Sequence, residues 1–155
     1  MRILFCPPSV SFSVADVARG YLSALRRSGC DVEVYPTRAQ FHQQKALAGE
    51  TRERLGWKTA CELILQAATY HRSDLVLFIC SQTFHPVILQ LLKRYKIAPA
   101  VLMTESPYQD DDQTTWAAHY PGMHVFTHEK FSAEKYGWHY LPHAYDPDVH
   151  KPTPP

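Results

Sequence analysis

The chain has 155 residues, of which 45% are hydrophobic and 20% charged, and this is the size and composition of one globular domain. Its 16 basic and 15 acidic residues give a formal net charge of +1, so neither nucleic acid nor an anionic membrane is expected as the main partner. No apolar run approaches the roughly 20 residues that span a bilayer, and the N-terminal apolar run ends at Pro7, too early for a secretory signal, so we expect a cytoplasmic protein.

The chain opens with a strand, a helix and a second strand. Residues 2–6 are continuously apolar, which is typical of a strand covered on both faces of a parallel sheet. Apolar residues at helical spacing predict a helix that ends near Gly29, and residues 31–35 alternate polar and apolar as a strand does. Such a unit with short connections is almost always right-handed and parallel.

The rest of the chain continues the alternation. Residues 37–72 are helical in character and are predicted to divide near Gly49. Further strands are predicted at 74–80, 100–104, 123–127 and 138–141, with helices that begin near 86, 110 and 132. This order predicts an α/β fold, a Rossmann-like three-layer α/β/α sandwich with a mostly parallel, doubly wound sheet. We expect residues 1–145 to form this domain and the Pro- and Asp-rich residues 146–155 to be an interdomain linker.

The four cysteines lack any C-x-x-C pair. Three of them fall in apolar strand or helix patterns, so we interpret them as small buried hydrophobic residues in a reducing compartment. Disulfides or a metal site are the less favoured alternatives.

Candidate ligand-binding residues gather where the predicted strands end. In an open α/β sheet, ligands bind beyond the carboxyl ends of the strands, near the switch in strand order. These exits supply hydroxyl, amide, imidazole, carboxylate and aromatic groups, which suit a polyhydroxylated ligand such as a sugar: Ser11, Gln82, Thr83, Glu105, His128, His143 and Tyr145. Purely structural roles remain open for two of these residues. Glu105 could cap the next element or pair with Lys130, and His143 could pack between the sheet and the linker.

Metal and dinucleotide sites are disfavoured by local context. His124/His128 and His139/His143 show an i, i+4 spacing, but both pairs fall in strand-to-loop segments where that spacing does not converge on one ion. Residues 110–112 are three aspartates, which we interpret as a solvated helix start rather than a cation site. The exit of the first strand has no glycine, whereas a G-x-G-x-x-G loop needs glycines near the pyrophosphate.

Three short segments in a fixed order carry a family resemblance. They are Thr104-Glu105-Ser106-Pro107-Tyr108, Val125-Phe126-Thr127-His128-Glu129 and Tyr140-Leu141-Pro142-His143-Ala144-Tyr145-Asp146. Together they resemble the N-terminal domain of GT-B fold glycosyltransferases, and more narrowly the CgeB-type spore-maturation glycosyltransferases. The similarity covers most of residues 1–152. The sequence departs from the family in having Pro7-Pro8-Ser9 where a glycine-rich loop is common, and we do not expect these 155 residues to include the family's donor-binding half.

The resemblance implies transfer of a sugar from a nucleotide-sugar donor, which acts as a co-substrate, to an acceptor, with no other cofactor. Glu105 is then the candidate general base or acceptor-orienting carboxylate. Ser11, Gln82, Thr83 and His128 would position the acceptor, while His143 and Tyr145 would line the interdomain cleft. The expected partners are a sugar acceptor and a C-terminal donor-binding domain or partner chain, without which the chain should be inactive, and self-association as a homodimer is also expected.

Two other functions compete with this one. The first is a non-catalytic carbohydrate- or partner-binding module with the same fold. The second is a flavodoxin- or receiver-like signalling domain, which ranks low because it needs an acidic cluster at the exit of the first strand, where Pro7-Pro8-Ser9 stands.

Overall fold

The computed structural model describes residues 1–9, 13–49 and 52–142, and within them the strands form one parallel sheet of six strands. The strand order is β2-β1-β3-β4-β5-β6. The strands are β1 (Arg2–Cys6), β2 (Asp31–Val34), β3 (Leu75–Ile79), β4 (Ala98–Met103), β5 (His124–Thr127) and β6 (His139–Tyr140). Every neighbouring pair is parallel, so the predicted α/β fold is confirmed.

The order of the strands reverses direction between β1 and β3. The chain first steps from β1 to β2 on one side, then crosses back to place β3 on the other side of β1, with Leu4 paired to Val76. From β3 the strands continue in sequence order to β6. Loops that leave β1 and β3 therefore diverge at this point, which is where ligands bind in open α/β sheets.

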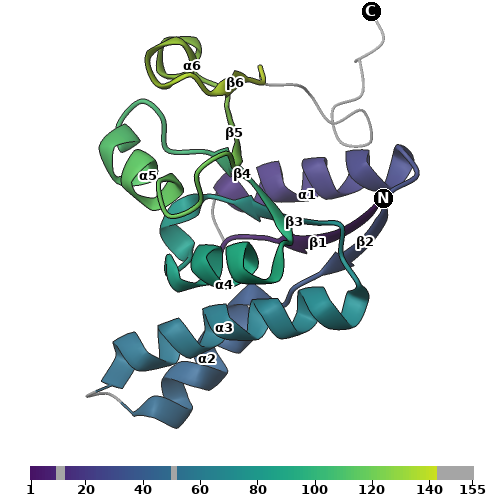
Figure 1. Cartoon of the computed structure of the whole chain (residues 1–155), viewed down its shortest axis with the longest axis vertical. Helices are drawn as coiled ribbons and strands as arrows, with labels where there is room; N and C mark the ends of the chain where they lie inside the picture. Colours follow the sequence, from purple (N-terminus) through teal and green to yellow (C-terminus); the bar gives the residue numbers. More distant parts are fainter. Residues whose placement is uncertain (10–12, 50–51, 143–155) are drawn as a thin grey trace, which may run out of the picture.

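Helices connect the strands on both faces of the sheet, as the sequence predicts. They are α1 (Ser13–Arg27), α2 (Thr37–Ala48), α3 (Glu53–His71), α4 (Val87–Tyr95), α5 (Asp110–Ala117) and α6 (Lys130–Tyr136), with a short 3-10 helix, η2 (Ser81–Thr83), after β3. Figure 1 shows α1 on one side of β1 and β3, and α3 and α4 on the other. Helix α2 packs on α3, and the two form a hairpin that extends past the sheet (Figure 1).

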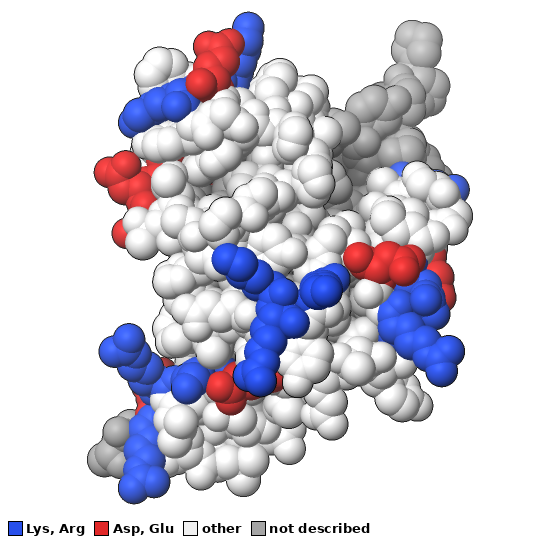
Figure 2. Space-filling view, in the orientation of Figure 1, with Lys and Arg blue, Asp and Glu red and all other residues white. Residues whose placement is uncertain are grey.

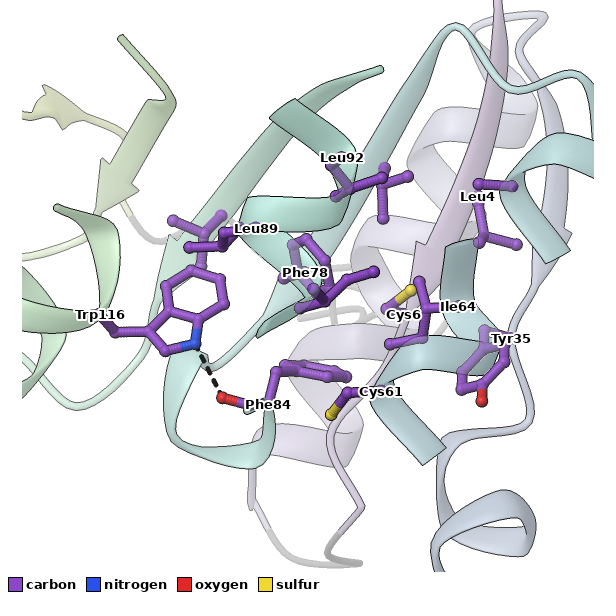
Figure 3. Packing of buried hydrophobic residues seen from close by; sticks show 14 of the residues in the cluster. Leu4, Cys6, Tyr35, Cys61, Ile64, Phe78, Phe84, Leu89, Leu92 and Trp116 are labelled. Carbon is purple, nitrogen blue, oxygen red and sulfur yellow. Dashed lines mark hydrogen bonds between the residues drawn. The ribbon is translucent and has the colours of Figure 1, made fainter. Parts of the chain in front are cut away.

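Alternation along the strands produces two separate cores. Leu4, Cys6 and Phe78 point toward α3 and α4, where the larger cluster is centred on aromatic rings (Figure 3). Phe78 makes edge contacts with Phe84 and Trp116, whose ring centroids lie 4.8 Å and 5.5 Å away. Phe5 lies on the opposite face in a smaller cluster with α1. Because β1 and β3 are covered on both sides, they read as continuous apolar runs.

Strand β4 begins two residues earlier than the predicted strand and contains Pro99, which pairs with Val76. Proline cannot donate a ladder hydrogen bond and is usually confined to strand starts or edges. Pro99 is the second residue of β4, so it lies at the start of an otherwise buried strand. The predicted strand at 100–104 therefore starts two residues too late, because its apolar pattern does not extend back through Pro99.

Charge is dispersed over the molecular face drawn in Figure 2. Basic and acidic side chains lie there in small separate groups rather than in one continuous basic surface. On this face the blue basic groups are more prominent than the red acidic ones (Figure 2). None of the helices in the described part of the chain is both long and apolar enough to cross a membrane.

The cysteines lead to a prediction about thiol reactivity. Cys6, Cys61 and Cys80 are buried and Cys30 is partly exposed, and all four are free thiols. Burial raises the pKa of Cys6, and it raises the pKa of Cys61 to about 12, so neither forms the reactive thiolate near neutral pH. With Ellman's reagent at pH 8, we expect Cys30 alone to react rapidly in the folded protein and all four thiols to react in urea. Rapid labelling that survives the Cys30→Ser change would contradict this.

Candidate functional site

The carboxyl ends of β1, β3 and β4 place three loops at one edge of the sheet, next to the switch in strand order. Residues 7–9 follow β1, Cys80 and η2 follow β3, and residues 104–109 follow β4. We define this edge, which includes Glu105 after β4, as the candidate site. The sequence predicts a site at this edge, and the topology brings the three exits together.

The backbone of Glu105 is held from both sides. Its N–H donates to Oε1 of Gln113 at 3.4 Å, and its carbonyl accepts from the N–H of Gln109 at 3.1 Å. Both partners belong to the segment that forms or precedes α5. The loop after β4 is therefore fixed by the helix that follows it, and the peptide bond from Ser106 to Pro107 within this loop is cis.

The carboxylate of Glu105 is held far more loosely than its backbone. Oε1 accepts from Oγ1 of Thr104 at 3.3 Å, and the Cys80 thiol approaches the same oxygen at 4.0 Å, a weak contact. The side chain is half-buried, and it makes no ion pair with any described residue. An ionised carboxylate offers about four acceptor positions. Most of its hydrogen-bonding capacity thus remains for a ligand.

Gln113 anchors this loop through a buried polar network. Its side chain is 0% exposed, and its Nε2 donates to Oγ of Ser106 at 3.1 Å and to Oδ1 of Asp110 at 3.3 Å. The other oxygen of Asp110 accepts from Oγ of Ser132 in α6 at 2.6 Å. The network runs from α6 through α5 to the backbone of Glu105, and each buried member has a partner, as buried polar groups require.

The exit of β3 contributes a strained residue and an unpaired hydroxyl. Cys80 has φ 66° and ψ 110°, a region that residues with a Cβ rarely occupy. The next residue, Ser81, is 1% exposed, and its Oγ has no hydrogen-bond partner among the described residues. Buried polar groups are normally paired, so this enclosed hydroxyl is an exception at the β3 exit. Gln82 is exposed, and its side-chain amide donates to Oε1 of Gln109, which joins the β3 exit to the β4 exit.

Two tryptophan side chains donate hydrogen bonds to the backbone that follows β3. Thr83 is buried, and its carbonyl accepts from the indole N–H of Trp57 at 2.8 Å, while the carbonyl of Phe84 accepts from Trp116 at 2.7 Å.

Nδ1 of His85 accepts from the N–H of Val87 at 3.2 Å, so a neutral His85 carries its proton on Nε2. Burial, helped by the positive charges of Arg54 and Lys58, lowers the pKa of His85. This histidine therefore favours the neutral form.

The structure brings Gln82, Thr83 and Glu105 to the edge of the sheet where the strands have their carboxyl ends. Thr83 is buried there, and its backbone carbonyl accepts the hydrogen bond from Trp57. His128 is half-buried directly after β5, two strands away from β3. Ser11, His143 and Tyr145, and with them the predicted linker at 146–155, lie outside the described residues. Lys130 pairs with Glu134 at 3.9 Å, so the ion pair considered between Lys130 and Glu105 is not formed.

Sequence reasoning missed the residues that support the site. Gln113 and Ser132 were not singled out, because a polar residue in a helix gives no signal of being buried. The helix start predicted at residues 110–112 is confirmed, since α5 begins at Asp110, but the expected solvation is wrong for Asp110, which is 7% exposed and hydrogen-bonded to two side chains. Asp111 and Asp112 are exposed as expected. The one available signal was position, since Asp110 and Gln113 lie on one face of α5 at i, i+3.

In comparisons with known proteins, no protein-family model matches the chain, and no curated protein matches it by sequence.

Proposed function

We propose that this chain is the acceptor-binding, Rossmann-like domain of a GT-B-type glycosyltransferase, similar to the CgeB-type enzymes. The observation that carries the proposal is the Glu105 carboxylate. It follows β4, the strand next to β3 at the strand-order switch, its backbone is fixed by Gln113 and Gln109, and it has no ion-pair partner among the described residues. A carboxylate so placed can accept a hydrogen bond, or a proton, from a sugar hydroxyl.

In the reaction, the acceptor oxygen bonds to the anomeric carbon of the donor sugar while the bond from that carbon to the nucleotide's phosphate oxygen breaks. The proton of the acceptor hydroxyl passes to Glu105 when Glu105 acts as a general base. A base must lie within about 3 Å of that hydroxyl, or reach it through one water. If Glu105 only orients the acceptor, the same hydrogen bond forms without the proton transfer.

Other groups at this edge suit a polyhydroxylated acceptor. Gln82 presents an exposed side-chain amide to solvent. Thr83, His128 and Ser11 are proposed to help position the acceptor. His143 and Tyr145 are proposed to line the interdomain cleft. The nucleotide-sugar donor would be held by a C-terminal domain or a partner chain. The chain on its own should therefore bind the acceptor without turning over the donor.

The proposal is tested by titrating the chain with a panel of mono- and oligosaccharides, followed through ¹H–¹⁵N NMR shifts. We expect shifts confined to the exits of β3 and β4, and about tenfold weaker binding in Glu105→Gln, which corresponds to roughly 1.4 kcal/mol. Asp112→Asn is the matched control, since it removes an exposed carboxylate of the same region. Nucleotide-sugars alone should produce no comparable shifts.

Two outcomes would count against parts of the proposal. Shifts that lie away from this edge, or binding equal in Glu105→Gln and wild type, would remove the acceptor site. Saccharide binding at this edge that never leads to turnover, even with a donor-binding half supplied, would instead favour a non-catalytic binding module. Near-normal turnover by Glu105→Gln in a complete enzyme would remove the base role alone.

A further inference from the structure

Outside the candidate site, β5 and β6, the last two strands of the sheet, bring two histidines together. In the register of these parallel strands, Phe126 pairs with His139, and His124 lies two residues before Phe126 on the same face of β5. Nδ1 of His124 lies 3.5 Å from Nε2 of His139. Both side chains are exposed.

A hydrogen bond between the two imidazoles explains this pair poorly. An N–H donor usually lies about 2.7–3.2 Å from its acceptor, so 3.5 Å is at the outer limit, and water competes at an exposed position. The two rings instead have the spacing of a chelate. Two nitrogens bound to one tetrahedral Zn²⁺, each at about 2.0–2.1 Å, are separated by about 3.3 Å.

Phe126 keeps one of the two ligands in place. Its ring lies against His139 with centroids 5.0 Å apart and planes inclined by 31°. Phe126 itself packs against the smaller core on the α1 side of the sheet. A ring held in this way loses little rotamer freedom when it binds an ion, which favours chelation.

We propose that His124 and His139 form a bidentate binding site for a transition-metal ion of the Zn²⁺ class. Imidazole nitrogen is a preferred ligand of Zn²⁺, Cu²⁺ and Ni²⁺. No group of three or more His, Cys, Asp or Glu side chains suited to a metal occurs in the described part of the chain. With these two ligands alone from the described residues, the ion would keep further coordination positions for water or for another nitrogen or oxygen ligand.

The test is calorimetric titration of the chain with ZnCl₂ in a chelator-free buffer at pH 7.5. We expect one ion per chain, and at least tenfold weaker binding in both His124→Asn and His139→Asn. His42→Asn is the control, since it removes an exposed histidine from α2 and should leave the affinity unchanged. Circular dichroism establishes that each variant is folded, which is expected because both positions are exposed.

Cu²⁺ as the probe identifies the ligands directly. Its electron paramagnetic resonance spectrum should show coupling to two imidazole nitrogens in the wild type and to one in each single variant. Absence of one-to-one Zn²⁺ binding would reduce the pair to neighbouring imidazoles and overturn the proposal. Binding that persists in both variants but is lost in His143→Asn would overturn it as well, because the ion would then belong elsewhere.

Discussion

Replacing Gln113 by leucine is expected to lower the free energy of unfolding by about 3 kcal/mol, because several buried polar groups lose their partner at once and each such group costs roughly 1–3 kcal/mol. Leucine has a similar volume, so the change tests hydrogen bonding rather than packing. The groups affected are the N–H of Glu105, the hydroxyl of Ser106 and one oxygen of Asp110. Urea unfolding followed by tryptophan fluorescence measures the loss.

The matched control is Thr115→Ala, an exposed position of the same helix whose hydroxyl donates only to the carbonyl of Asp111. It should change stability by less than about 0.5 kcal/mol, as most surface substitutions do. A second readout separates the site from the rest of the domain. In Gln113→Leu the ¹⁵N resonance of the Glu105 amide should move, while those of β1 and β2 stay in place. A loss below about 1 kcal/mol, within the range of one ordinary hydrogen bond, would show that the network does not anchor the loop.

The sheet was predictable because its signal is local. Strands such as β1 and β3 are buried on both faces, so each reads as a run of apolar residues without reference to any other part of the chain. Gly137 marks the end of α6 with φ 69°, a conformation that glycine adopts freely. The position of the candidate site followed from the parallel topology alone, because the exits of parallel strands share one edge.

What could not be predicted depends on contacts between distant segments. Asp110 is buried because Ser132, twenty-two residues later, supplies a hydroxyl that satisfies it. The i, i+4 spacing in the sequence pairs His124 with His128, yet the partner of His124 is His139, because strand register and not helical spacing decides which rings meet. Burial of a polar residue and pairing across strands are properties of the assembled fold, and neither leaves a periodic trace in the sequence.

The contact between α2 and α3 is another such property, and it depends on Gly56. A Cβ added at this buried glycine would lie 2.6 Å from the carbonyl oxygen of Gln44 and 2.9 Å from Cα of Lys45. Those atoms belong to the backbone of α2, so they cannot turn aside as a side chain would. The two helices therefore approach so closely that only glycine fits at this position, and nearby Lys45 and Glu53 form an ion pair at 2.6 Å.

For Gly56→Ala, helix propensity and packing predict opposite signs. Alanine in a helix interior is favoured over glycine by about 1 kcal/mol, whereas overpacking a close contact costs roughly 1–3 kcal/mol and sometimes more. We expect packing to prevail, because the contact is with backbone and places the overpacking cost at its upper end of about 3 kcal/mol, which leaves a net loss of about 2 kcal/mol in urea unfolding. Arg54→Ala, two residues away on the exposed face, should change stability by less than about 0.5 kcal/mol.

The packing of the other face of α3 determines which part of the protein Gly56→Ala destabilises. Ala60, Cys61 and Ile64 remain packed on the sheet, so α3 keeps its position and α2 has to move away. Hydrogen exchange should therefore speed up in the amides of α2 and much less in those of β1 and β3, since local opening follows the weakened contact. If stability instead rises by about the 1 kcal/mol that propensity alone gives, the helices are not in backbone contact at Gly56.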